Sequence, residues 1–90
     1  GAIAALTRSM AVEFAPHKVR VNAVAPCVTR TLRVLAQLEA SETTQKLAAR
    51  HLVDLAEPLD VANAALFLAS DESARTTGHI LAVDSGLTIS

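Results

Sequence analysis

Apolar residues in the first part of the chain recur at helical spacing. Residues 2–16 are therefore predicted to form a helix, with a buried stripe made of Ile3, Leu6, Met10 and Phe14. The opposite side of this helix is also mostly apolar, so we expect the helix to be buried on more than one side. Pro16, followed by His17 and Lys18, marks its end.

Two later segments have strand patterns. Apolar and polar residues alternate over residues 19–25, which predicts a strand. Pro26 ends its pairing, because proline has no N–H to donate. A second strand is predicted over residues 79–84, between Gly78 and the pair Ser85-Gly86. Its continuous apolar run ILAV is typical of a strand covered on both faces.

Helical patterns fill the region between the strands. A short amphipathic helix is predicted over residues 32–38, and Ser41 can cap a second helix that runs to about His51. Residues 52–57 form a connector, and Pro58 sits at the first position of a third helix, where its missing N–H costs nothing. This helix ends near residues 70–72. Its predicted buried face comprises Val61, Ala62, Ala65, Leu66 and Leu68.

The order helix, strand, helices, strand defines the fold class. It predicts an α/β protein in which crossover connections join parallel strands. Two strands do not make a parallel sheet that is stable by itself. We therefore expect residues 1–90 to be the tail of a larger doubly wound domain, incomplete as a domain on their own.

Composition excludes several function classes. The 90 residues carry a net charge of −1 and only 2% aromatic residues, and they contain no basic block, so nucleic acid is not an expected partner. No apolar run approaches the roughly 20 residues of a membrane span, and no secretory leader is visible. The single cysteine, Cys27, has no internal disulfide partner, which fits a cytoplasmic protein.

Candidate catalytic and metal-binding residues are sparse. The three histidines, at positions 17, 51 and 79, are dispersed without metal-ligand spacing, so we expect surface or loop histidines and no metal site. Cys27 has no neighbouring His or Lys in sequence to form a thiolate, which favours a passive small residue. Nothing in the sequence orients a Ser-His-Asp triad.

Three segments together resemble a known family. They are ALTRSMAVEFAPHKVRVNAVAP at residues 5–26, PCVTRT at residues 26–31 and EPLDVANAALFLASDESARTTGHILAVDSG at residues 57–86. In this order and spacing they resemble the short-chain dehydrogenase/reductases, close to the bacterial 3-oxoacyl-reductase-like members. The first resembles the helix after the catalytic Tyr and Lys with the sixth strand, the second the PG-x-[IV]-x-T cofactor loop, and the third the closing helix with the seventh strand.

The resemblance implies a fold and a cofactor. Residues 1–90 are expected to be the C-terminal part of one Rossmann-like domain that binds NAD or NADP. The expected cofactor-binding residues are Pro26, Cys27, Thr29 and Thr31. Backbone groups at Thr29 would hydrogen-bond the nicotinamide carboxamide, and Thr31 would supply a hydroxyl, which satisfies a buried polar atom without adding charge. Asn22 is expected to be a structural hydrogen-bonder.

The family habit also implies partners. The substrate would be a small carbonyl compound or secondary alcohol, and the intact protein would be a homo-oligomer, either a dimer or a tetramer. The outer face of the helix over residues 2–16 is expected to contact a partner subunit.

The chain departs from the family pattern at three glycine positions. Cys27 follows the proline where glycine is usual, the PLGR segment reads HLVD at residues 51–54, and DGG reads Asp84-Ser85-Gly86. Cys27, Val53 and Ser85 therefore carry side chains where the family has none. A Cβ at Cys27 would narrow the path for the nicotinamide or demand different backbone angles.

The family's catalytic apparatus is not found within these 90 residues. They contain no tyrosine, and neither the YxxxK motif, its catalytic Ser nor the TGxxxGxG loop is found. Two hypotheses follow. In the first, the chain belongs to an enzyme that transfers a hydride between nicotinamide and a carbonyl or alcohol, and the chain alone is inactive. In the second, it is a non-catalytic family remnant that serves as an oligomerisation or interaction module.

Overall fold

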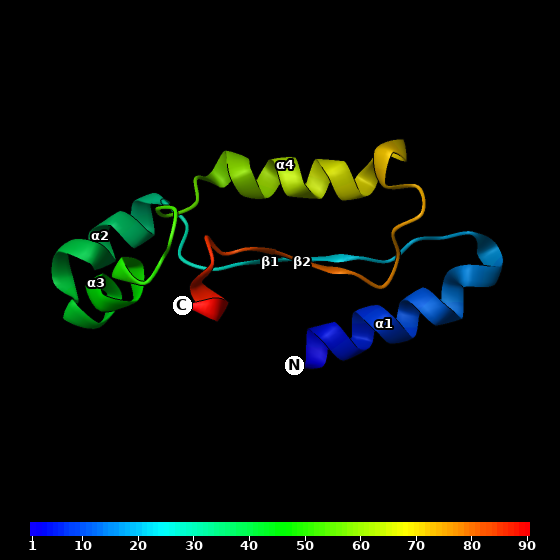
Figure 1. Ribbon diagram of the computed structural model, residues 1–90, viewed down its shortest axis with the longest axis horizontal. Helices are drawn as coiled ribbons and strands as arrows, with labels where there is room; N and C mark the ends of the chain where they lie inside the picture. Colours follow the sequence, from blue (N-terminus) through cyan, green and yellow to red (C-terminus); the bar gives the residue numbers. More distant parts are fainter. The chain divides into compact units, whose positions relative to one another are not determined.

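The computed structural model describes all 90 residues, Gly1–Ser90 (Figure 1). Along the chain it contains α1 (Ala2–Phe14), β1 (Ala23–Pro26), α2 (Leu32–Ala40), α3 (Glu42–Ala49), α4 (Pro58–Ala69) and β2 (Ile80–Val83). Short 3-10 helices follow at Ala15–His17, Asp71–Ser73 and Leu87–Ile89. β1 and β2 pair as a parallel two-stranded sheet. The predicted α/β order of helix, strand, helices and strand is confirmed.

The chain divides into two compact units. The first contains Gly1–Ala25 and Asn63–Ala82, and the second contains Pro26–Ala62 and Val83–Ser90. The second unit therefore contains the loop that follows β1, the helices α2 and α3, and the connector that leads to α4.

α1 ends close to the predicted position, but it packs through a different face. Its last α-helical residue is Phe14, and Pro16 lies in the following 3-10 helix. Ile3, expected in the core, is 72% exposed, whereas Thr7 and Ala11 are buried. The ideal Cβ position at Gly78 is 3.5 Å from the Ala11 Cβ. α1 therefore packs against the segment around Gly78 through the small residue Ala11. The predicted buried stripe is wrong.

Both strands are shorter than predicted because side chains replace part of the ladder. Asn22 Nδ2 donates to the Thr76 carbonyl oxygen at 3.0 Å, and Asn22 Oδ1 accepts from the His79 amide at 3.0 Å. Regular pairing begins only beyond these residues. The structural hydrogen-bonding role expected of Asn22 is confirmed, and the strand predicted over residues 19–25 starts at Ala23.

Helix capping follows the sequence closely in the second unit. Ser41 caps α3, because its side chain accepts from the Thr44 amide at 3.2 Å. α2 and α3 are joined by a hydrogen bond of 2.7 Å from Gln45 Nε2 to the Leu38 carbonyl oxygen. α4 begins at Pro58 as predicted.

The buried core is small and half polar. Four apolar residues are buried, and so are four polar or charged ones: Ala11, Ala56, Leu68 and Leu87, and Thr7, His51, Ser73 and Asp84. The buried face predicted for α4 is correct only at Leu68, since Leu66 is 67% exposed. β2 is half-buried or exposed rather than covered on both faces. The elements present leave much of their apolar surface uncovered, which is why these two predictions are wrong.

Candidate functional site

The loop that follows β1, residues 26–31, lies against the connector between α3 and α4. Thr29 forms an isolated parallel bridge with Ala56, and the Arg30 amide donates to the Ala56 carbonyl oxygen at 2.8 Å. Ala56 is buried. The bridge is made through the amide of Arg30, which leaves the backbone N–H of Thr29 outside it. The loop is thus fixed on one side.

The two predicted threonine hydroxyls have local roles in this loop. Thr31 is the N-cap of α2, and its Oγ1 accepts from the Val34 amide at 3.2 Å. A hydroxyl has one proton and two lone pairs, so the Thr31 proton is not used by the cap. Thr29 Oγ1 donates to the Cys27 carbonyl oxygen at 3.2 Å. The Thr29 side chain therefore stiffens the turn, and the Thr31 proton is free for a further acceptor.

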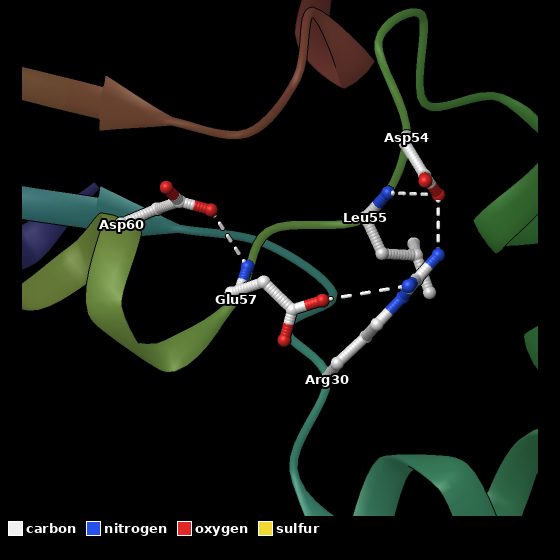
Figure 2. A network of polar contacts seen from close by, with 5 residues as sticks. All are labelled: Arg30, Asp54, Leu55, Glu57 and Asp60. Atoms are coloured by element: carbon white, nitrogen blue, oxygen red, sulfur yellow. Dashed lines mark hydrogen bonds and ion pairs between the residues drawn. The ribbon is translucent and has the colours of Figure 1, made fainter.

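An ion-pair network joins the same loop to the connector. Figure 2 shows the Arg30 side chain extending toward two carboxylates: Nη2 is 2.6 Å from Asp54 Oδ1, and Nη1 is 3.4 Å from Glu57 Oε1. Asp54 Oδ1 also accepts from the Leu55 amide at 2.8 Å. The Leu55 amide, and then the Arg30 guanidinium, lower the pKa of Asp54 below its ordinary value. Asp54 is therefore held ionised as a partner for Arg30.

The turn after β2 is organised by a buried carboxylate. Asp84 Oδ1 accepts from the Gly86 amide at 3.1 Å, and Asp84 Oδ2 accepts from the Thr88 hydroxyl at 2.8 Å and the Thr88 amide at 3.3 Å. These bonds lower the pKa of Asp84 below its ordinary value, and the hydrogen bond from the Thr88 hydroxyl has the largest effect. The side chain therefore closes its own turn.

The structure assembles no metal centre, and one of the three histidines is buried. No group of three or more His, Cys, Asp or Glu side chains is close enough to hold a metal ion. His17 and His79 are exposed, and His51 lies in the loop after α3, in agreement with the prediction, although it is buried there. Its Nδ1 lies 3.0 Å from the Leu47 carbonyl oxygen, and its Nε2 has no partner. His51 follows Arg50, the C-cap of α3, and its ring folds back onto the last turn of that helix.

Comparisons with known proteins agree along the whole chain. A family model described as "Enoyl-(Acyl carrier protein) reductase" matches residues 1–88. Carbonyl reductase (NADPH) 2 of Sus scrofa is 46% identical over 87 residues, which cover 96% of this chain and 36% of that protein. The structure of a short-chain type dehydrogenase/reductase from Mycobacterium ulcerans matches with a TM-score of 0.88 and 35% identity, covering 98% of this chain and 32% of that one.

This chain belongs to the short-chain dehydrogenase/reductase family. It spans about a third of the length of the curated relatives it matches. The family is one of oxidoreductases, and the fold is part of a Rossmann-like α/β domain. A further relative is named inactive 2-(S)-hydroxypropyl-CoM dehydrogenase 2, from Xanthobacter autotrophicus. That relative is 38% identical over 93 residues, and the match covers 98% of this chain and 40% of the relative.

The three substituted glycine positions of this short-chain dehydrogenase/reductase differ in backbone conformation. Ser85 has a φ of +51°, in the left-handed region, whereas Cys27 and Val53 do not have positive φ. A side chain is therefore accommodated without backbone strain at the latter two positions. Of the three positions, only Ser85 therefore carries the cost of a left-handed side chain.

The four predicted cofactor residues lie on one short loop of this family member. Pro26 ends β1, Cys27 is half-buried, and Thr29 and Thr31 follow it before α2. Sequence reasoning missed Arg30, although the acidic Asp54 in place of the basic residue of PLGR was a signal that a basic partner lies nearby.

No helix in the structure is both long enough and apolar enough to traverse a lipid bilayer.

Proposed function

We propose that residues 1–90 are the C-terminal portion of a single NAD(P)-binding domain in a short-chain oxidoreductase. The intact protein would transfer a hydride between nicotinamide and a carbonyl compound or secondary alcohol. The observation that carries the proposal is the match of residues 1–88 to the family, which includes the loop after β1. The name of the pig relative, a carbonyl reductase that uses NADPH, supports this reaction class.

The loop after β1 suits the nicotinamide side of a dinucleotide. Ligands of open α/β sheets bind beyond the carboxyl ends of the strands, and residues 26–31 follow the carboxyl end of β1. The backbone N–H of Thr29 stands outside the bridge to Ala56, and the Thr31 proton is not used by the helix cap. These groups would hold a carboxamide or phosphate oxygen of NAD or NADP, and Pro26 and Cys27 would line the entry. The bound cofactor would supply or accept the hydride.

The chain on its own lacks a suitable proton donor. It contains no tyrosine, the residue that serves the family as general acid and base, and neither the family's catalytic Ser nor its catalytic Lys is found in these 90 residues. Proton transfer to the substrate oxygen requires a positioned group with a matched pKa. We therefore expect the isolated chain not to turn over.

A chimera tests this proposal directly. Residues 1–88 would replace the matching third of pig carbonyl reductase (NADPH) 2, with which they share 46% identity. The expected result is a folded protein that binds NADPH and reduces ketones, while the 90-residue chain alone does neither. A folded chimera without NADPH binding, or ketone reduction by the chain alone, would contradict the proposal.

Exposed apolar residues on α1 support a homo-oligomer. Ile3, Leu6 and Val12 are all exposed large apolar side chains on this helix, with Val12 on the side opposite Ile3, and extensive exposed apolar surface marks protein contacts. A dimer or tetramer of the intact protein would cover them, and Leu6→Glu would weaken the assembly in analytical ultracentrifugation.

The free Cys27 agrees with a reducing cytoplasm as the compartment.

A non-catalytic remnant is the second candidate. Ser85, at a left-handed position where the family has glycine, indicates relaxed constraint on one loop. The relative named as inactive is 38% identical to this chain. This candidate predicts that the chimera described above assembles normally but fails to bind NADPH.

A further inference from the structure

Arg30 is the one side chain that ties the candidate cofactor loop to the connector by charge. It lies between Thr29 and Thr31, the two residues proposed to contact the nicotinamide side. Its guanidinium reaches Asp54 at 2.6 Å and Glu57 at 3.4 Å (Figure 2). Arg30 therefore points toward the connector.

The connector itself holds one of the two carboxylates, that of Asp54, in place for Arg30. Asp54 has a φ of +77°, a left-handed conformation that aspartate tolerates better than most residues. Its Oδ1 accepts from the Leu55 amide, which fixes the carboxylate over the turn. The Glu57 amide donates to Asp60 Oδ2 at 2.8 Å, so the start of α4 is closed by its own cap-like bond. The connector thus presents a preorganised acceptor at Asp54 and a fixed backbone at Glu57, whose carboxylate is the second acceptor.

The loop has few other attachments. Apart from the Arg30 side chain, its tie to the connector is the bridge between Thr29 and Ala56, which is made through the Arg30 amide. Segments with few contacts open locally at low free energy. The ion pairs of Arg30 contribute little to overall stability. They can still shift the fraction of molecules in which the loop lies against the connector.

We infer that Arg30 is a positioning residue for the cofactor: its two ion pairs hold the backbone of Thr29 and the hydroxyl of Thr31 where the nicotinamide side binds. The inference rests on the proposed function. Arg30 itself does not contact the cofactor, because its guanidinium is engaged by Asp54 and Glu57.

The test uses the full-length oxidoreductase that contains this chain, with Arg30→Gln, Asp54→Asn and the double variant. Each single variant is expected to raise the KM for NADH or NADPH about two- to fivefold, the effect of an exposed ion pair, with kcat nearly unchanged. The double variant should be no worse than Arg30→Gln, because both changes remove the same pair. Arg30→Lys should recover part of the loss. Arg75→Gln and Glu72→Gln, outside the network, serve as charge-matched controls.

A second measurement does not depend on turnover. Hydrogen exchange of the peptide covering residues 26–31 should be faster in Arg30→Gln than in the unmodified protein, and unchanged in Arg75→Gln. An unchanged cofactor KM and unchanged exchange in Arg30→Gln would overturn the inference alone. Failure of the unmodified protein to bind either cofactor would overturn the proposed function, and the inference with it.

Discussion

Arg20 Nη1 donates a hydrogen bond of 2.8 Å to the carbonyl oxygen of Leu68, near the end of α4. Its Nη2 donates to the Ser70 carbonyl oxygen at 3.1 Å, and Nη1 also reaches Ser73 Oγ at 3.0 Å. The last carbonyls of a helix lack partners within the helix and carry its negative dipole end. A cation supplied from the segment before β1 therefore completes α4, instead of pairing with a carboxylate.

Removing this cation is expected to destabilise the protein. Arg20→Gln should lower the free energy of unfolding by about 1.5–3 kcal/mol, the range for a hydrogen-bonded charged group. Urea denaturation of the proposed intact oxidoreductase would measure the change. Arg75→Gln is the matched control, since Arg75 bonds only the adjacent Ala74 carbonyl. A loss in Arg20→Gln no larger than in the control would show that the helix end is satisfied without Arg20.

Thr31 combines a helix cap with the proposed cofactor contact, and substitutions separate the two. Thr31→Val should cost roughly 1 kcal/mol of stability through loss of the N-cap, and it should also raise the cofactor KM. Thr31→Asn retains a capping oxygen without the hydroxyl, so only the KM should rise. Ser41→Ala removes the equivalent cap of α3, and it should lower stability without changing the KM. An unchanged KM in both Thr31 variants would confine Thr31 to capping.

The element order was predictable because local signals are strong in this chain. Ser41 and Pro58 mark helix starts by their own chemistry, and both helices begin where they indicate. The start of β1 was not predictable in the same way. Asn22 follows the alternating pattern, but its side chain bonds Thr76 and His79 across 54 and 57 residues of sequence. Periodicity carries no information about such distant partners.

The candidate site was predictable as a loop but not as a network. Its residues, from Pro26 to Thr31, follow a strand end that the pattern locates. The pairing of Arg30 with Asp54 depends on the connector's folded course, which brings together residues that are 24 apart. Burial was the least predictable property. Thr7 and His51 are buried, whereas Ile3 is exposed. In a core this small, the residues that become buried are those that the tertiary packing happens to cover, and hydrophobicity alone does not identify them.

The turn after β2 should respond in opposite ways to two neighbouring substitutions. Gly86 has a φ of +82°, and a Cβ there would lie 2.6 Å from Leu52 Cδ1, so Gly86→Ala should cost about 1–3 kcal/mol. Ser85→Gly should stabilise by up to about 1 kcal/mol, because it relieves a left-handed side chain. Val53→Gly is the control, since Val53 lacks positive φ and should lose stability. A gain in melting temperature from Val53→Gly would contradict this assignment of strain.

The lowered pKa of Asp84 predicts sensitivity to acid. Its hydrogen bonds favour the ionised form in the folded state, so the folded pKa lies below the ordinary value of 3.8. The resulting stability is fully present above that value and is lost as the pH falls through the folded pKa. Asp84→Asn should flatten the fall in melting temperature below about pH 4, whereas Asp71→Asn, at an exposed site, should not. An unchanged acid limb in Asp84→Asn would assign the acid sensitivity to other carboxylates.

The 90-residue chain by itself is expected to unfold without a sharp transition. Its buried apolar residues are only Ala11, Ala56, Leu68 and Leu87, and no side chain is less than 2% exposed. Cooperativity requires a shared core, and small chains bury too little surface to form one easily. Heating should therefore reduce the far-ultraviolet circular dichroism gradually, with no calorimetric peak, whereas the proposed intact oxidoreductase should show one. A monomeric 90-residue chain with a sharp calorimetric transition would show that these two strands and four α-helices are a domain in their own right.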